Sequence, residues 1–274
     1  MQTILIPTDF SANARNAVNY AVRLFGADNR FILLNTWHAP YTPPEVLISV
    51  EDILMKASKE GLEKEVAAAQ KLPGAEKIKF ETVSEFGNLV DILNEVVREK
   101  NVNLVVMGTQ GASGLRETVL GSNTASAAKN IGCPLLIIPA GAEFKNLKSI
   151  VFAADYKQLE KSDSLAAMVA IAKSQNSEIT ILNVLDKGKI TDVKQGYEGL
   201  KIDHLLAGIK HKFSFIEDDD KAAGIDEYLH TNNPDLLVML ERKTGFFKSI
   251  FQRSITKQMA FHTHVPMLVL HERE

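Results

Sequence analysis

The chain has 274 residues, of which 45% are apolar and 24% are charged, and its formal net charge of −3 excludes a general attraction to nucleic acid. Its single cysteine, Cys133, excludes an intrachain disulfide and a cysteine-based zinc cluster. The N-terminal residues lack a signal-peptide pattern, and no segment has the roughly 18 apolar residues of a membrane span, so we expect a cytoplasmic protein that binds neither nucleic acid nor membranes.

In the first half of the chain, short apolar runs alternate with helical patterns. The predicted strands are 3–8, 30–37, 77–83, 103–108 and 134–138, and the predicted helices are 12–25, 45–71, 88–100 and 122–131. Alternating strands and helices favour right-handed crossovers and a parallel sheet. We therefore predict an α/β fold, with a doubly wound five-stranded sheet in the order 3-2-1-4-5.

The same elements then occur a second time in the same order. Four pairs of segments resemble each other, namely 3–11 and 149–157, 31–37 and 179–185, 101–108 and 233–240, and 133–139 and 265–271. The offset between the copies falls from 146 residues at Asp9 and Asp155 to 132 at Pro134 and Pro266. The pattern predicts two tandem domains, 1–141 and 146–274, with the second one shortened mostly after its second strand.

The predicted site of domain one lies where the strand order reverses, between the first and fourth strands. Asp9 follows the first of these strands, and the stretch GTQGASGLRETVLGSNT (108–124) follows the fourth. Gly108 and Gly111 would let backbone N–H groups approach an anion. Gly121 precedes a helix for which we expect Ser122 to be the N-cap, and a helix N-terminus suits a phosphate.

Other groups would complete a nucleotide site. The Asp9 carboxylate accepts hydrogen bonds, so it suits a ribose hydroxyl or an adenine amine. The backbone of Thr36 would read a base edge, and Ser122 and Thr124 add hydroxyl donors. Two simpler interpretations stay open: a merely flexible glycine loop and a capping role for Asp9. Ser122 and Thr124 are also considered as phosphoacceptors, although capping already explains a serine there.

The segments ILIPTDFS, MGTQG and LGSNT resemble the universal stress protein family, and the spacing G-x2-G-x9-G-S matches that family's ATP-binding motif. The resemblance implies an adenine nucleotide alpha-hydrolase-like fold and ATP binding, with Mg or Mn as the accompanying ion. Pro7, Asp9 and Thr36 would contact adenosine. The other residues that it implies for ATP are Thr8, Met107, Gly108, Gly111, Gly121, Ser122, Asn123 and Thr124.

Domain two departs from this motif. Glu241 stands where Gly108 stands, Thr244 replaces Gly111, and Arg253-Ser254 replaces Gly121-Ser122. A carboxylate beside a triphosphate is repulsive, and the acidic run 217–220 adds to that repulsion. We therefore expect domain two to bind ATP poorly or not at all. Binding of a different anion by domain two stays open, because three cations lie in this stretch: Lys243, Lys248 and Arg253.

Three further features have both a structural and a functional interpretation. His262, His264 and His271 are considered as metal ligands, but they straddle a helix-to-strand turn and the end of a strand, so we expect no metal site there. Cys133 is expected to be a small core residue in preference to a redox centre. The run GFFKSIF (245–251) is expected to pack within the protein in preference to forming a docking surface.

The leading hypothesis is a tandem stress-response protein that binds ATP in domain one, with domain two as a degenerate structural or regulatory partner. No nucleophile elbow or HExxH motif occurs, so we expect no enzyme activity beyond slow ATP hydrolysis. The resemblance also implies that the final strands pair the two domains as an intrachain pseudo-dimer, with further homodimerisation and an unidentified protein partner. The alternatives are a nucleotide-independent scaffold and a weak ATPase or phosphotransferase.

Overall fold

The structure is a computed structural model that describes residues 1–38, 44–109, 120–154, 162–188, 193–241 and 264–271. The chain divides into two compact units: apart from residues 118–120, unit 1 ends at Phe144 and unit 2 begins at Lys145. The boundary between the two units thus lies in the short segment between the predicted domains, which end at residue 141 and begin at residue 146. Within the described ranges, no helix has the length and apolar character needed to cross a membrane.

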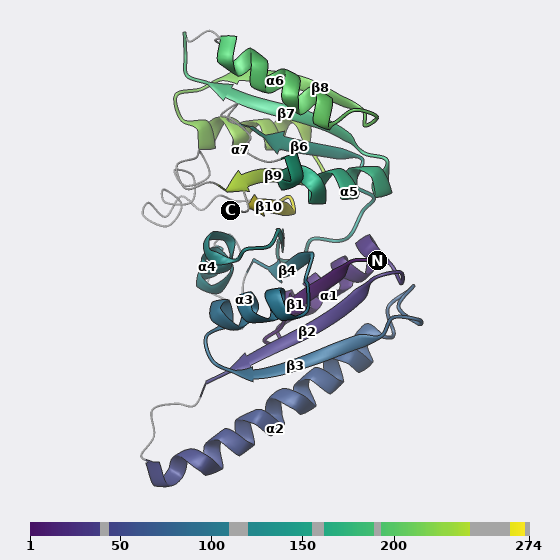
Figure 1. The fold of residues 1–274 in the computed structure, drawn as a ribbon, viewed down its shortest axis with the longest axis vertical. Helices are drawn as coiled ribbons and strands as arrows, with labels where there is room; N and C mark the ends of the chain where they lie inside the picture. Colours follow the sequence, from purple (N-terminus) through teal and green to yellow (C-terminus); the bar gives the residue numbers. More distant parts are fainter. Residues whose placement is uncertain (39–43, 110–119, 155–161, 189–192, 242–263, 272–274) are drawn as a thin grey trace. The chain divides into compact units, whose positions relative to one another are not determined.

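Unit 1 is a parallel sheet in the order β3-β2-β1-β4-β5, which confirms the predicted order (Figure 1). Helices α1 and α2 contact each other, as do α3 and α4. Its elements are β1 (Thr3–Pro7), α1 (Ala12–Phe25), β2 (Arg30–Trp37), α2 (Pro44–Ala69), β3 (Phe80–Phe86), α3 (Leu89–Glu99), β4 (Leu104–Gly108), α4 (Ser122–Asn130) and β5 (Leu135–Ile138).

The centre of the unit 1 sheet forms from apolar runs that are buried along almost their whole length. β1, β4 and β5 have almost only buried residues, as strands covered on both faces should. The edge strand β3 begins at Phe80, three residues later than the predicted strand. Ile78 lies in the preceding turn, where its N–H donates to the carbonyl of Ala75, so its apolar side chain is buried without belonging to the strand.

Unit 2 has the equivalent order β8-β7-β6-β9-β10, again with parallel neighbours. The helix between its second and third strands has 13 residues, against 26 in α2, which places most of the shortening of copy two here. The elements are β6 (Ser149–Ala153), the 3₁₀ helix η1 (Ser162–Leu165), α5 (Ala166–Gln175), β7 (Glu178–Leu185), α6 (Val193–Leu205), β8 (His211–Glu217), α7 (Lys221–Asn232), β9 (Leu236–Glu241) and β10 (Met267–His271).

Candidate functional site

The candidate site of unit 1 lies at the carboxyl ends of β1 and β4. These two strands are parallel neighbours, with Ile4 paired to Leu104. Their carboxyl ends therefore meet at the same edge of the sheet, at the point where the strand order reverses. This places the segment after Pro7 beside the segment that begins at Gly108, as the sequence predicts.

The turn after β1 is held on both sides by hydrogen bonds. The N–H of Thr8 donates to the carbonyl of Leu34 at 2.7 Å, and the side-chain amide of Asn35 donates to the carbonyl of Thr8 at 2.7 Å. The Thr8 hydroxyl accepts the N–H of Phe10 at 3.0 Å. Thr8 and Asn35 are both buried, so these bonds fix the backbone from which the exposed Asp9 projects.

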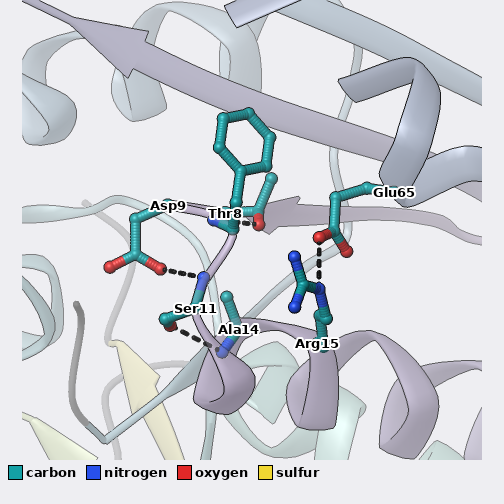
Figure 2. Close-up of polar contacts among 7 residues, drawn as sticks. Thr8, Asp9, Ser11, Ala14, Arg15 and Glu65 are labelled. Carbon is teal, nitrogen blue, oxygen red and sulfur yellow. Dashed lines mark hydrogen bonds and ion pairs between the residues drawn. The ribbon is translucent and has the colours of Figure 1, made fainter. Parts of the chain in front are cut away.

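Asp9 and Ser11 have separate tasks at the start of α1 (Figure 2). The Ser11 hydroxyl caps the helix by accepting the N–H of Ala14 at 3.2 Å. The Asp9 carboxylate accepts the N–H of Ser11 at 3.1 Å, so it braces the turn that precedes the helix. The capping role considered for Asp9 therefore belongs to Ser11, and Asp9 itself is exposed after the carboxyl end of β1.

Gly108 lies close against the first turn of α1, where little room is left for a side chain. A Cβ atom at Gly108 would lie 3.0 Å from the backbone carbonyl oxygen of Asn13 and 3.3 Å from its Cβ. Side chains other than hydrogen would push α1 away from the strand. The glycine thus sets how closely α1 approaches β4, a role additional to the anion approach expected from the sequence.

Hydrogen bonds tie the two ends of the glycine-rich segment together. The N–H of Gly121 donates to the carbonyl of Thr109 at 2.6 Å, and the N–H of Thr109 donates to the carbonyl of Ile138 at 2.9 Å. The hydroxyl of the buried Thr124 donates to the carbonyl of Gly108 at 2.8 Å. The start of α4 is therefore held against the end of β4. Gly111 lies outside the described residues.

The prediction that Ser122 caps α4 is wrong. Gly121 occupies the N-cap position in an extended conformation, its own N–H donates to the carbonyl of Thr109, and no side chain of the described residues caps this helix end. Ser122 becomes the first helical residue, and both Ser122 and Asn123 are exposed. No side-chain cap from the described part of the chain satisfies the N–H groups of this first turn, which suit a ligand or water.

The remaining predicted contacts lie on the strands. Pro7 ends β1 and Met107 belongs to β4, and both are buried. Thr36 is half-buried in β2, next to Asn35. Asn35 was missed by the sequence interpretation, although a signal existed: it is a polar residue inside an apolar strand, and Asn183 repeats it in the second copy.

Unit 2 keeps the strand clamp and changes what surrounds it. The Asn183 amide donates to the carbonyl of Ala154 at 2.8 Å, as Asn35 does to Thr8. However, Ala154 has no hydroxyl to hold the following turn. The prediction that Glu241 stands where Gly108 stands is wrong: Leu236 pairs with Ile150 of β6 as Leu104 pairs with Ile4 of β1, so the register places Leu240 at the position of Gly108. Glu241 is one residue further along, as the last residue of β9. Five residues of the altered motif, and the aspartate that corresponds to Asp9, lie outside the described ranges: Asp155, Lys243, Thr244, Lys248, Arg253 and Ser254.

The other candidates from the sequence have structural settings. Cys133 is buried, and its thiol donates to the carbonyl of Val102 at 3.6 Å. His264 stacks on His230 with ring centroids 4.6 Å apart, and His271 ends β10. In the described part of the chain, no group of three or more His, Cys, Asp or Glu side chains could hold a metal ion. His262 and the run 245–251 lie outside that part.

Comparisons with known proteins give the same family. The model of the universal stress protein family matches residues 1–139. Universal stress protein YxiE of Bacillus subtilis is 37% identical over 91 residues, which are 32% of this chain and only 60% of that protein. Universal stress protein MJ0531 of Methanocaldococcus jannaschii is 27% identical over 141 residues, 49% of this chain and 80% of that protein.

A solved structure resembles the whole chain. The universal stress protein from Archaeoglobus fulgidus has a TM-score of 0.67 and covers 99% of this chain and 97% of its own. Its sequence identity is 17%, so this likeness speaks for the fold alone.

Proposed function

The chain belongs to the universal stress protein family, and on that premise we propose that unit 1 binds an adenine nucleotide, with ATP as the leading ligand. The observation that carries the proposal is the start of α4. Its first turn has no side-chain cap, and the bond between Gly121 and Thr109 holds it at the end of β4. Free N–H groups at a fixed helix N-terminus, at the reversal of strand order, suit a phosphate group.

Each part of the nucleotide has a candidate partner in this arrangement. The phosphates would take the N–H groups of Ser122 and Asn123, with Mg or Mn as the accompanying ion. Asp9 would accept a hydrogen bond from a ribose hydroxyl or the adenine amine. Thr36 lies on the neighbouring strand β2, where its backbone would read the base edge. Thr124 would act indirectly, because its hydroxyl already holds the carbonyl of Gly108.

We assign unit 2 a structural or regulatory role in the stress response, with poor or no ATP binding. Two of its differences lie in the described residues. Ala154 lacks the hydroxyl by which Thr8 holds the turn before α1, and Glu241 places a carboxylate at the end of β9. A fixed negative charge at that position would repel a phosphate. Any hydrolysis of ATP by the chain would be slow.

Isothermal titration of ATP with Mg into the nucleotide-free chain tests this proposal. We expect one site per chain. Gly111→Val should abolish it by filling the glycine-rich segment, and Asp9→Ala should weaken it. Asp155→Ala, the matched change in the second copy, should leave binding unchanged. Circular dichroism of each variant would separate loss of the site from loss of the fold.

Other outcomes would contradict parts of the proposal. Two equivalent sites would show that Glu241 does not prevent binding in unit 2. No binding by the folded wild-type chain would make it a nucleotide-independent scaffold. Turnover of ATP that is lost in Asp9→Ala would instead place the protein among weak ATPases.

A further inference from the structure

The turn between β1 and α1 contains a phenylalanine in a backbone conformation that bulky residues rarely adopt. Phe10 has a φ of 64°, in the left-handed region. Glycine enters this region freely and asparagine tolerates it, whereas a bulky side chain there is strained. The other residues besides glycine that have a positive φ in the described part of the chain are all asparagines: Asn101, Asn176 and Asn233. Phe10 is therefore the exception, and another part of the fold must hold it in this conformation.

A contact with α2 offsets the strain at Phe10. Its ring lies against Gly61, where an added Cβ atom would stand 2.4 Å from Cζ and 2.6 Å from Cε2 of the ring. Only a residue without a side chain leaves room for the ring at this place. A glycine in the middle of a helix is itself unfavourable. The sequence thus carries two locally unfavourable residues that fit each other.

Phe10 is also the middle residue of a hydrogen-bonded turn that holds Asp9. The Asp9 carboxylate accepts the N–H of Ser11 at 3.1 Å, so the three residues form an Asx turn (Figure 2). Such a turn closes only for particular backbone angles of its middle residue. A change of φ at Phe10 would rotate Asp9 relative to Ser11 and break this hydrogen bond.

Both ends of the turn are fixed by other contacts. On the strand side, the buried Thr8 is hydrogen-bonded through its N–H and through its carbonyl. On the helix side, the Ser11 hydroxyl caps α1. The direction of the Asp9 carboxylate is therefore set by the backbone of the two residues between these ends, of which Phe10 is the strained one.

We propose that Phe10 is a positioning residue for the nucleotide. Its ring, held against Gly61, keeps the backbone in the left-handed conformation that directs the Asp9 carboxylate toward a ribose hydroxyl or the adenine amine. This role rests on the function proposed for unit 1. Phe10 acts through Asp9, so α2 influences the affinity of the site through a single aromatic ring.

The size of the effect follows from how often each residue type occupies the left-handed conformation. For an alanine without the ring contact, this conformation is disfavoured enough to hold only about one tenth of the molecules. Glycine occupies it about as readily as the right-handed region. A ligand that requires one conformation binds more weakly in proportion to the fraction of molecules that have it. Loss of the ring should therefore weaken binding about tenfold for alanine and only about twofold to threefold for glycine.

Isothermal titration of ATP with Mg into the Phe10→Ala and Phe10→Gly variants tests the proposal. Both variants lose the packing of the ring, and they differ in how readily residue 10 takes a positive φ. We expect Phe10→Ala to bind ATP about tenfold more weakly than the wild type, and Phe10→Gly to stay within about threefold of it. If the ring contributes only to packing, both variants will bind ATP with the same affinity. Circular dichroism of each variant shows that it is folded.

Gly61→Ala tests the same contact from the side of α2. Its methyl group would displace the Phe10 ring, so this variant should weaken ATP binding although residue 61 lies on another helix. In the Phe10→Gly background no ring remains to be displaced, and the effect of Gly61→Ala on ATP binding should disappear. An equal effect in both backgrounds would show that Gly61 acts independently of the ring.

Hydrogen exchange without ligand tests the turn separately from ATP. The N–H of Ser11, which donates to the Asp9 carboxylate, should exchange about tenfold faster in Phe10→Ala than in Phe10→Gly. A wild-type chain that binds no ATP would overturn the proposed function, and the exchange of Ser11 would then decide alone whether the ring holds the turn. Equal ATP affinity of the wild type and Phe10→Ala, or equally weak binding by both Phe10 variants, would overturn the positioning role.

Discussion

Asn35 shows how a single polar side chain inside an apolar strand fixes the start of the candidate site. Its amide bonds the buried carbonyl of Thr8, which has no strand partner at that point because β1 has ended. A buried carbonyl without a partner costs free energy, so the strand carries an asparagine where an apolar residue would otherwise pack better. Asn183 does the same for Ala154 in unit 2.

Asn35→Ala should lower the free energy of unfolding of unit 1 by about 1–3 kcal/mol, because it leaves the Thr8 carbonyl buried and unpaired. It should also weaken ATP binding, since the turn that carries Asp9 loosens. Denaturant unfolding followed by fluorescence of Trp37, the single tryptophan, reports on unit 1. Asn183→Ala should destabilise unit 2 similarly. Weakened ATP binding in Asn183→Ala as well would argue against a local effect.

We expect His211 to make the stability of unit 2 depend on pH. Burial disfavours its charged form, but the pKa of His211 is raised overall because its two ring nitrogens face the carbonyl of Ile209 at 2.8 Å and the carboxylate of Asp203 at 2.9 Å. Only the imidazolium donates to both acceptors. The bond to Asp203 joins the end of α6 to the start of β8.

A raised pKa means that His211 stabilises the folded state fully below its unfolded pKa, and that this stabilisation is lost as the pH rises through the folded pKa. Unit 2 should therefore unfold at lower denaturant concentrations as the pH increases from about 6 to 8. Asp203→Asn removes the charged acceptor and should flatten this dependence, as measured by circular dichroism. A pH profile identical to that of the wild type would contradict the assignment.

At the scale of elements, α2 is held to the turn before α1 by an aromatic contact and to α1 itself by an ion pair. Phe10 follows β1 with a positive φ of 64°, and its ring packs on Gly61 of α2, where an added Cβ would lie 2.4 Å from Cζ. Arg15 reaches the buried carboxylate of Glu65 at 2.6 Å (Figure 2). The long helix α2 thus also braces the turn that holds Asp9.

Gly61→Ala tests this contact through the sign of its effect. In an open helical position the change would stabilise a protein by about 1 kcal/mol. Here it should destabilise unit 1 by about 1–3 kcal/mol, because the Phe10 ring must move off the helix. In a Phe10→Ala background the same change should become neutral or stabilising. Trp37 fluorescence measures the free energy of unfolding of the wild type, the two single variants and the double variant. If Gly61→Ala has the same effect with and without the Phe10 ring, the two residues are not coupled.

The elements of unit 1 could be predicted from the sequence because their apolar runs are local. The parts that could not be predicted depend on contacts between distant residues. Ile78 looks like strand but is buried in a turn, and Ser122 looks like a cap, but the bond from Gly121 to Thr109 moves the helix start. The contact of Gly108 with Asn13 has no sequence signal, because a glycine before a loop suggests a ligand equally well.

At the scale of the whole molecule, the two units have the same strand order but different edges. Unit 1 has the glycine at the end of β4, the Thr8 turn and the uncapped α4. Unit 2 has kept the strand order and the asparagine clamp, has lost the Thr8 hydroxyl and half of the long helix, and carries phenylalanines on β8. The two units therefore differ in what they offer a ligand.

This division predicts an uneven response to ATP. A ligand that binds only the folded form of unit 1 stabilises that unit by about 2.7 kcal/mol at a concentration of 100 times its Kd. Hydrogen exchange should therefore slow in β1, β4 and the first turn of α4 when ATP is added, because opening of these segments is coupled to release of the ligand. Segments of unit 2 that do not open together with unit 1, such as β7 and α7, should exchange at an unchanged rate. The Gly111→Val variant provides the control, since ATP should leave its rates of hydrogen exchange unchanged in every segment. Equal slowing in β7 and α7 would mean either a second nucleotide site or strong coupling between the units, and titration of the number of sites would separate these two causes.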